Sequence, residues 1–493
     1  MNVKKFRKSE KILKWTPKDV VMNVIVYVLN TLILAGLFFI FLHTTGKGES
    51  MIENLKTSAH FASFMVSLIV LVFIYFFFED RNFLKNSANS EMIFFILEIS
   101  LFICYAIGHY VNMFLRPFAL PALLIMFLVN RRSAVFVNII FTIIVFLVDV
   151  FSGQAWIITY SSLFSCFASG LVATFCTNKD CSRIKLLSVS WVISLPTVLG
   201  VFLILLGANF NGALLYLVLS ACSGPFAVMD FIILLPILET LFQRVSCFKL
   251  AELTDHKSKL IRRLIAEAPG TFNHSIVVSN IAEACATAIG EDALLARTCA
   301  YYHDIGKLRR PEFFSENLVE GNSPHDELMP ELSANIIRSH VQDGYELVRK
   351  SGMPRSIANV CLEHHGTMPI LFFYGKAKKY TDGEVDIKDY CYHGPKPQSK
   401  IAAILMIADG CEAASRSLKN RSRENVTTIV RKIVNDRMEL GQFDECEITI
   451  KELNIIIHTV VNNLTGVYHK RVEYPKISLN GLNLNKETSK EEQ

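Results

Sequence analysis

The feature that most constrains this chain is a succession of long apolar runs that fills its first half. A helix needs about 20 mostly apolar residues to cross the hydrocarbon core of a bilayer. The runs predict eight membrane spans, at residues 21–43, 61–78, 92–110, 114–130, 134–152, 155–176, 186–206 and 210–242. Gly224-Pro225 and Pro236 interrupt the last run, which is either one kinked span or a short re-entrant piece followed by a span.

Composition supports a membrane protein and excludes two other classes. Charged residues make up 19% of the chain and apolar residues 51%, whereas an average soluble domain is about 25% charged. So apolar a chain is neither one soluble domain nor disordered. The twelve Cys form no C-x-x-C pair, which argues against a disulfide framework and against a zinc ribbon.

Lysine and arginine predict the orientation, because they concentrate in cytoplasmic loops. With a cytoplasmic N-terminus, 15 of the 18 Lys and Arg before residue 246 fall inside, and only Lys47, Lys56 and Arg116 fall outside. Eight spans then return the chain to the cytosol. The second half holds 32 Lys and Arg against 33 Asp and Glu. It lacks the excess of basic residues that binding to duplex nucleic acid requires, so we expect no duplex partner. The expected partner of the apolar first half is the lipid bilayer.

The charge pattern and the helical period divide the chain into five parts. They are a basic cytosolic segment (1–20), a transmembrane domain (21–245), a charged connecting helix (246–268), a helical domain (269–472) and a polar tail (473–493). Within the helical domain, the period predicts helices near 271–289, 293–304, 332–351, 354–365, 398–418, 423–440 and 447–469, and a looser insert at 366–397. The expected fold class is all-α, a polytopic membrane bundle followed by a cytosolic helical domain.

Two carboxylates are predicted at membrane depth, Glu98 and Asp230. An ionisable group in lipid is costly and is therefore a functional candidate. A transport or ligand-binding function for this pair is one hypothesis that the sequence raises.

The histidines carry the stronger chemical signal, because ten of the thirteen lie after residue 255. Seven potential ligands fall at the ends or on the inward faces of five predicted helices: His274, His303, Asp304, His340, His364, His365 and Asp409. Helix bundles build metal sites in this way. Imidazole and carboxylate without thiolate suit iron, manganese, zinc or nickel. Seven ligands are too many for one ion and enough for two, and two ions stabilise both the attacking and the leaving oxygen of phosphodiester hydrolysis.

The order His274, His303-Asp304, Asp409 is the H…HD…D pattern of the HD phosphohydrolase superfamily. Five strings are closer still: "APGTFNHS", "YYHDIGK", "NSPHDELMPELSANIIRSHVQDG", "EHHGT" and "AAILMIADGCEAASRSL". With these strings the chain resembles, from about residue 225 to 472, the seven-transmembrane HD family of bacterial cyclic di-AMP phosphodiesterases. The membrane block also resembles that family's arrangement of one span followed by seven.

The resemblance implies a multi-pass protein of the bacterial cell membrane, with a cytosolic HD domain that opens cyclic di-AMP to pApA. It implies two divalent metal ions, usually iron or manganese, with His303 and Asp304 at the catalytic centre. One ion would be held by His274, His303, Asp304 and Asp409. The other would be held by Asp304, His340, His364 and His365, with Asp304 bridging.

Residues near this centre are candidates for contact with the substrate. Lys307 and Arg310 follow the bridging aspartate closely enough to meet a phosphate oxygen. Tyr302 and Tyr374 are candidates for stacking on adenine. His325 either orients a loop or supports a metal ligand.

The chain departs from the family between its first two spans, where the family carries a large extracellular domain. Residues 44–60 are too few to fold as one. Three alternatives stay open: an HD hydrolase of another nucleotide, a non-catalytic membrane nucleotide sensor, and a transporter with a vestigial HD domain. The native metal, the preference among cyclic dinucleotides and the oligomeric state also stay open, although the connecting helix is a candidate contact in a homo-oligomer.

Overall fold

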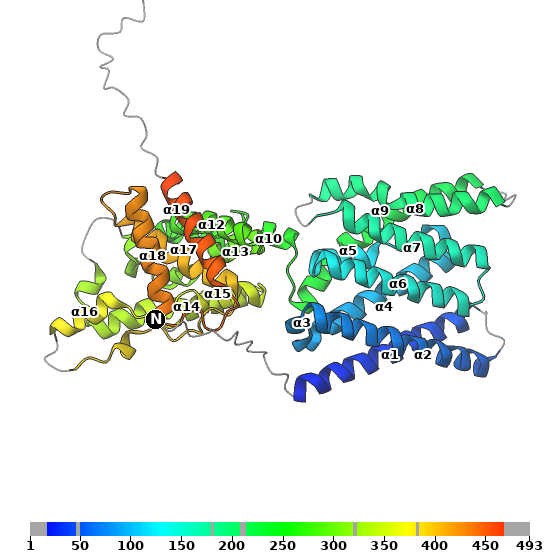
Figure 1. Cartoon of the computed structure of the whole chain (residues 1–493), viewed down its shortest axis with the longest axis horizontal. Helices are drawn as coiled ribbons and strands as arrows, with labels where there is room; N and C mark the ends of the chain where they lie inside the picture. Colours follow the sequence, from blue (N-terminus) through cyan, green and yellow to red (C-terminus); the bar gives the residue numbers. More distant parts are fainter. Residues whose placement is uncertain are drawn as a thin grey trace, which may run out of the picture. The chain divides into compact units, whose positions relative to one another are not determined.

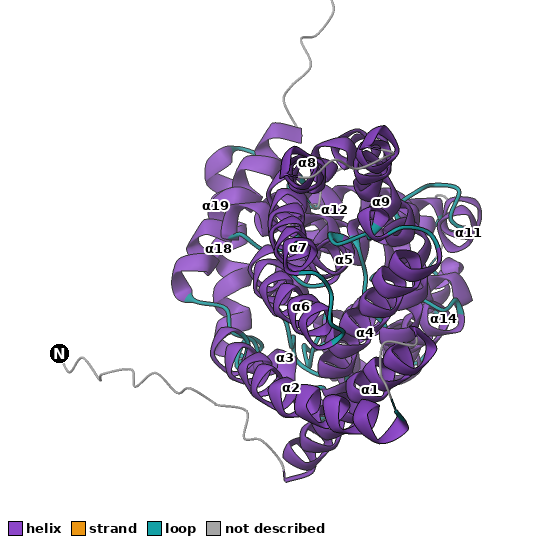
Figure 2. Ribbon diagram, turned by 90° about the vertical axis from the view of Figure 1, so that its right-hand side faces the viewer, coloured by secondary structure: helices purple, strands orange, loops and turns teal. Residues whose placement is uncertain are grey.

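The computed structural model describes residues 17–45, 50–178, 182–207, 213–318, 323–380 and 384–467. Most of the predicted basic segment 1–20 and all of the predicted polar tail 473–493 lie outside these residues. The chain divides into two compact units, Met1–Leu250 and Ala251–Gln493. Every regular element of the described residues is a helix (Figure 2), apart from one isolated β-bridge between Pro369 and Cys391. The predicted all-α fold class is confirmed.

The described residues of the first unit include seven helices that are long and apolar enough to cross a membrane (Figure 1). They are α1 (Pro17–Thr45), α2 (Met51–Glu79), α4 (Ser87–Tyr110), α6 (Arg131–Phe151), α7 (Trp156–Cys176), α8 (Arg183–Gly207) and α9 (Ala213–Phe242). A short helix, α3 (Arg81–Lys85), joins α2 to α4. The run whose form was open from the sequence is one continuous helix, α9, with Pro225 and Pro236 inside it.

The predicted span at 114–130 differs from the other seven, because it is not one long helix. It consists of a single 3₁₀ turn (Met113–Leu115), an irregular stretch, and α5 (Leu120–Leu128). Nine residues rise only about 14 Å, which is half of a membrane crossing. Pro117 and Pro121 lie at the start of this helix and supply no backbone donor there.

The segment between α4 and α6 nevertheless crosses the unit. Helix α4 follows α2 through the five residues of α3, so α2 ends and α4 begins at the same face. Helix α6 begins at that face too, because Arg132 near its start pairs with Glu79 at the end of α2 (3.2 Å). The chain must therefore return from the far end of α4 through residues 111–130. Every residue of α5 is buried, as irregular backbone at membrane depth requires.

Arg116, which the sequence places in an outer loop, is in fact buried at the start of this broken span. Its guanidinium lies 3.2 and 3.3 Å from the two carboxylate oxygens of Asp149. The hydroxyl of Tyr105 donates to the same carboxylate (2.7 Å), and the Arg116 guanidinium lies over the Tyr105 ring at 4.6 Å. The side chains of Arg116 and Asp149 are 3% and 0% exposed. Arg116 is thus buried within the bundle, and its place on the outer side of the membrane stays a prediction.

The two deep carboxylates do not form a pair with each other. Glu98 lies on α4 and Asp230 on α9. Within the described residues, Glu98 Oε1 and Asp230 Oδ2 have no hydrogen-bond partner. The hypothesis of a joint transport or ligand site for this pair stays a prediction.

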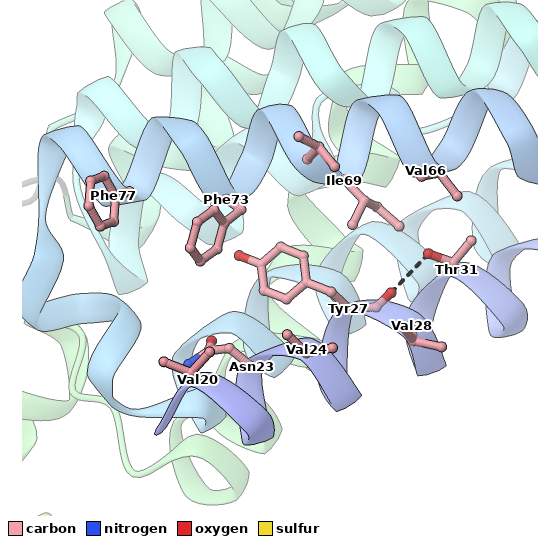
Figure 3. Close-up of a pocket in the computed structure, with 11 residues that line it drawn as sticks. Val20, Asn23, Val24, Tyr27, Val28, Thr31, Val66, Ile69, Phe73 and Phe77 are labelled. Carbon is pink, nitrogen blue, oxygen red and sulfur yellow. Dashed lines mark hydrogen bonds between the residues drawn. The ribbon is translucent and has the colours of Figure 1, made fainter. Parts of the chain in front are cut away.

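Helices α1 and α2 leave an apolar groove of about 540 Å³ between them (Figure 3). Its walls are mostly Val, Ile and Phe side chains, and Tyr27 lies across it with its ring edge against Phe73. Thr31 Oγ1 donates to the carbonyl of Tyr27 within its own helix (2.8 Å), while the Tyr27 hydroxyl has no hydrogen-bond partner among the described residues. The groove is part of the apolar surface that these helices present to lipid.

The second unit is a bundle around α12 (Pro269–Ile289), which packs against α13 (Ala293–Tyr302), α17 (Lys400–Arg416) and α19 (Ile450–Val467). The other helices are α14 (Pro330–Lys350), α15 (Arg355–Glu363), α16 (Leu371–Tyr380) and α18 (Arg423–Glu439). All seven helices expected in the helical domain are present. Helix α12 ends at Gly290 with φ +79°, a conformation that glycine adopts without strain. The insert at 366–397 contains α16.

The connecting segment is not one helix over 246–268, as the sequence predicts. It consists of α10 (Cys247–Leu253) and α11 (Lys259–Glu267). Residues 254–258 form a turn in which Asp255 accepts a hydrogen bond from the backbone of Lys257 (2.9 Å). Such local bonds compete with helix formation. Helix α11 buries Leu260, Ile261 and Leu264 and packs on α12.

Candidate metal centre

Seven residues that are distant in the sequence meet at one place in the second unit. His274 lies on α12, His340 on α14 and Asp409 on α17. His303-Asp304 follow the last residue of α13, and His364-His365 follow the last residue of α15. The ligand atoms of six of them form two groups, each within 4.8 Å, that share one carboxylate. The first group is His274, His303 and Asp304, and the second is Asp304, His340, His364 and His365.

Asp304 is the shared residue. Its Oδ1 lies 3.3 Å from His340 Nε2 and 3.6 Å from His364 Nε2. Its Oδ2 lies 3.3 Å from His303 Nε2 and 3.7 Å from His274 Nε2. The two oxygens of one carboxylate therefore point to the two groups. This is the arrangement that a bridging ligand needs.

Asp409 lies between the two groups. Its Oδ1 is 3.0 Å from His274 Nε2 and its Oδ2 is 3.8 Å from His365 Nδ1. The sequence expectation assigns it to the first group alone. In the structure it faces a member of each group, with the shorter distance to the first.

Three histidines are aimed at the centre by their own helices. The Nδ1 of each lies close to a backbone carbonyl three or four residues earlier: His303 to Ala300 (2.7 Å), His340 to Ile337 (2.6 Å) and His364 to Val360 (3.1 Å). These contacts assign the proton to Nδ1, which donates to the carbonyl. The Nε2 lone pair is then left free for a ligand.

Two supporting residues could not be found from the sequence. Glu412, one turn after Asp409, accepts a hydrogen bond from His274 Nδ1 (2.6 Å) and also pairs with Arg416. Tyr392 stacks on His365, with ring centroids 4.3 Å apart. The spacing from Asp409 to Glu412 was the one available signal for the former. Tyr392 lies in the irregular insert, where no periodicity marks it.

The site contains buried atoms that find no partner within the part of the chain that the structure describes. His303 Nε2 and Asp304 Oδ1 are buried and accept or donate no hydrogen bond. His303 is 0% and Asp304 2% exposed, so water does not compensate them. A buried polar group without a partner is costly. Imidazole nitrogens and carboxylate oxygens are suitable ligands for divalent metals, so the residues fit the metal pair that the sequence implies.

The electrostatics of the two groups differ. Burial lowers the pKa of His274, but its hydrogen bonds to Asp409 and Glu412 outweigh burial and raise that pKa to about 10. Burial lowers the pKa of His364 and, well below the usual range, of His365. Although burial alone would raise it, the pKa of Asp304 lies well below its usual range because of His303 and Lys307. Without metal, His274 therefore holds a proton, whereas His364 and His365 are neutral imidazoles.

Lys307 lies at the edge of this centre. Its Nζ is 2.8 Å from Asp304 Oδ2 and 2.6 Å from Glu316 Oε1. Burial lowers the pKa of Lys307, but the two carboxylates overcome burial and raise it. The ammonium is therefore charged and fixed beside the shared carboxylate.

The other expected substrate contacts fare differently. Arg310 is exposed and ends the 3₁₀ turn that follows Asp304. Tyr302 is completely buried, and its hydroxyl donates to the carbonyl of Leu253 (2.7 Å), so its ring offers no face to adenine. Tyr374 packs near Tyr390 (5.9 Å) and under the ammonium of Lys378 (4.6 Å). The hypothesis for Tyr302 is not supported, and those for Arg310 and Tyr374 stay predictions.

His325 orients a loop, one of its two expected functions. Its Nε2 bonds the carbonyl of Phe313 (2.9 Å), and its own carbonyl accepts from Lys376 on α16 (3.0 Å). Its ring packs against Phe373 (5.0 Å). None of these contacts reaches a member of the two ligand groups.

Comparison with known proteins identifies both units. Residues 58–246 match the family described as a 7TM receptor with intracellular HD hydrolase, and residues 271–414 match the HD domain. The chain is 35% identical over 428 residues to the cyclic-di-AMP phosphodiesterase PgpH of Bacillus subtilis, and 36% identical over 435 residues to that of Listeria monocytogenes. In both units the chain is therefore similar to this seven-transmembrane HD family.

The matches cover most of this chain but not most of the relatives. They include 84% and 85% of this chain and 59% of each relative, so the chain spans about three fifths of their length. The crystal structure of the L. monocytogenes PgpH HD domain is 46% identical and matches in full, covering 43% of this chain with a TM-score of 0.42. The same domain has been solved in complex with cyclic di-AMP. The seven long apolar helices and the match to the 7TM family model support a multi-pass membrane protein.

Proposed function

We propose that this protein is a membrane-bound, metal-dependent phosphodiesterase that hydrolyses cyclic di-AMP to pApA. The observation that carries the proposal is the pair of ligand groups sharing Asp304, with His303 Nε2 and Asp304 Oδ1 buried and unpartnered among the described residues. The names of the two PgpH relatives and the cyclic di-AMP complex of the Listeria domain support the substrate.

Two divalent ions, iron or manganese, are the proposed cofactors. His274, His303, Asp304 and Asp409 hold one, and Asp304, His340, His364 and His365 hold the other. Together the ions supply a nucleophile at neutral pH and stabilise negative charge on the phosphoryl oxygens. The remaining chemistry belongs to the chain itself. Glu412 fixes the tautomer and direction of His274, since it accepts from Nδ1 at 2.6 Å.

Lys307 is the proposed phosphate contact of the chain. Its ammonium is charged and lies beside the shared carboxylate, while its side chain retains 13% exposure. A fixed cation at this point attracts a phosphate and needs no reorganisation when charge develops during reaction. Arg310, exposed one turn later, is the second proposed contact.

The proposed location is a bacterial cell membrane, with the N-terminus and the HD domain in the cytoplasm. Seven long helices and the broken span make eight passes, so both ends of the first unit lie on one side. Basic residues gather on that side: Lys85, Arg131, Arg132, Arg183, Lys185 and Arg244. Basic residues face the cytoplasm in membrane proteins.

The test uses the full chain in detergent micelles, loaded with manganese or with iron. It is incubated separately with cyclic di-AMP and cyclic di-GMP, and the products are separated by chromatography. Formation of pApA that a chelator abolishes supports the proposal. Cleavage of another nucleotide alone refutes the substrate. Binding of two metals and of cyclic di-AMP without cleavage favours the non-catalytic sensor.

A further inference from the structure

Lys307 is held from two sides, and only one of its partners belongs to the ligand groups. Asp304 contributes one oxygen at 2.8 Å, and Glu316 contributes another at 2.6 Å. The ammonium also lies 5.0 Å from the centre of the Phe314 ring. Among the described residues, the Glu316 carboxylate pairs with Lys307 and accepts from Thr271, and its side chain is 17% exposed. Its carboxylate is therefore available to act on Lys307.

Glu316 is fixed in turn by the first turn of α12. Thr271 Oγ1 donates to Glu316 Oε1 (3.2 Å). The neighbouring Asn317 accepts from the backbone of Thr271 (3.0 Å) and donates to its hydroxyl (2.9 Å). These bonds join the 314–317 segment to the helix that carries His274.

Gly270 allows this contact, because the backbone of Glu316 passes directly over it. A Cβ at residue 270 would lie 1.8 Å from the carbonyl oxygen of Glu316 and 2.9 Å from the Asn317 amide oxygen. Backbone atoms cannot give way cheaply at such a distance. The absence of a side chain at residue 270 therefore lets Glu316 reach Lys307.

We propose that Glu316 is a positioning residue that keeps the Lys307 ammonium at the metal centre. This inference rests on the proposed function, because Lys307 matters only if a phosphate enters there. Divalent cations beside Asp304 would repel an ammonium and would draw Asp304 away from it. Glu316 supplies the counter-charge that holds Lys307 when Asp304 is engaged with metal.

The first measurement reports on Lys307 without activity. The full chain, depleted of metal, is treated with an amine-reactive reagent, and the modification of Lys307 is followed by peptide mass spectrometry. Glu316→Gln should raise the rate of Lys307 modification about tenfold, since one of two ion pairs is lost. Glu312→Gln is the matched control, because Glu312 lies two residues before the 314–317 segment and is exposed. Gly270→Ala should reproduce the Glu316→Gln result.

The second measurement is turnover of cyclic di-AMP by the metal-loaded full chain. Glu316→Gln should lower kcat about 10- to 100-fold, the loss expected for a charged hydrogen bond, with metal content unchanged. In a Lys307→Ala background it should cause no further loss. Wild-type labelling and wild-type kcat in Glu316→Gln would overturn the inference, and so would loss of metal. If the wild-type chain cleaves nothing, the proposed function fails, while the labelling result still decides whether Glu316 positions Lys307.

Discussion

The two units of this protein both bury charged groups, but they resolve the cost differently. In the membrane unit, the buried Arg116 guanidinium faces the Asp149 carboxylate, and the Tyr105 hydroxyl donates to that carboxylate, although Glu98 Oε1 and Asp230 Oδ2 have no partner among the described residues. In the second unit, His303 Nε2 and Asp304 Oδ1 are left without a partner among the described residues. A buried charge that finds its counter-charge in the chain holds the fold together. A cluster of imidazoles and carboxylates whose ligand atoms stay unpartnered is suited to a metal cation from outside.

The largest expected effect is at the shared carboxylate. Asp304→Ala removes a ligand from both groups, so cyclic di-AMP turnover should fall by about 1,000-fold or more. Elemental analysis should find fewer than two metals per chain, and circular dichroism should find the helix content unchanged. Asp436→Asn, on the exposed face of α18, is the control. Undiminished turnover in Asp304→Ala would remove the basis for the dinuclear site.

The opposite result is expected in the membrane unit. Asp149→Ala leaves the Arg116 guanidinium buried without its partner, which should lower the free energy of unfolding by about 3–5 kcal/mol. Thermal unfolding in micelles measures this loss, and the metal content of the folded fraction should stay at the wild-type value. The double variant Arg116→Met/Asp149→Leu should recover most of the stability. If Asp149→Ala kept the wild-type stability but lost metal, Asp149 would not be the counter-charge that stabilises the fold, and the contrast between the two units would be wrong.

A smaller effect on metal affinity is expected for Glu412, the hydrogen-bond partner of His274 Nδ1. Glu412→Gln keeps a hydrogen-bond acceptor for Nδ1 but removes the charge, so metal affinity should fall about 10- to 100-fold. Competition with a chelator of known affinity measures this change. Glu439→Gln at the exposed end of α18 should leave the affinity unaltered. An affinity equal to wild type in Glu412→Gln would show that the His274 contact is structural.

The smallest expected effect is the release of a proton when the first metal ion binds. Burial lowers the pKa of His274, but hydrogen bonds to Asp409 and Glu412 raise it to about 10 without metal, so below that pH a metal ion displaces the proton from Nε2. Affinity for the first ion should therefore rise with pH and level off near pH 10. Binding at pH 8, followed by calorimetry in buffers of different ionisation enthalpy, should release about one proton. In the second group, burial lowers the pKa of His364 and of His365, so these two residues should release no proton when metal binds.

The sequence was sufficient to find the seven residues that meet at the candidate metal centre, because most of them lie at helix ends or on inward helix faces. His303-Asp304 and His364-His365 end predicted helices, and helix ends converge in a bundle. The apolar runs likewise marked the spans. The run at 114–130 was misread as one helix, because composition does not report that Arg116 turns inward to meet Asp149 on α6.

What the sequence missed depends on tertiary contacts. Glu316 and Lys307 are nine residues apart, and they meet because Gly270, on another helix, admits the backbone of Glu316. Tyr302, next to His303-Asp304, was a candidate for stacking on adenine. The Tyr302 side chain is instead buried, and its hydroxyl donates a hydrogen bond to the carbonyl of Leu253. No spacing rule relates such pairs.

The most direct test of the account is to titrate metal into the depleted full chain while following turnover of cyclic di-AMP and bound metal in the same sample. Hydrolysis of cyclic di-AMP should rise only as the second equivalent of metal binds, because the two ligand groups share Asp304. Full turnover with one metal per chain, or in the presence of excess chelator, would contradict it.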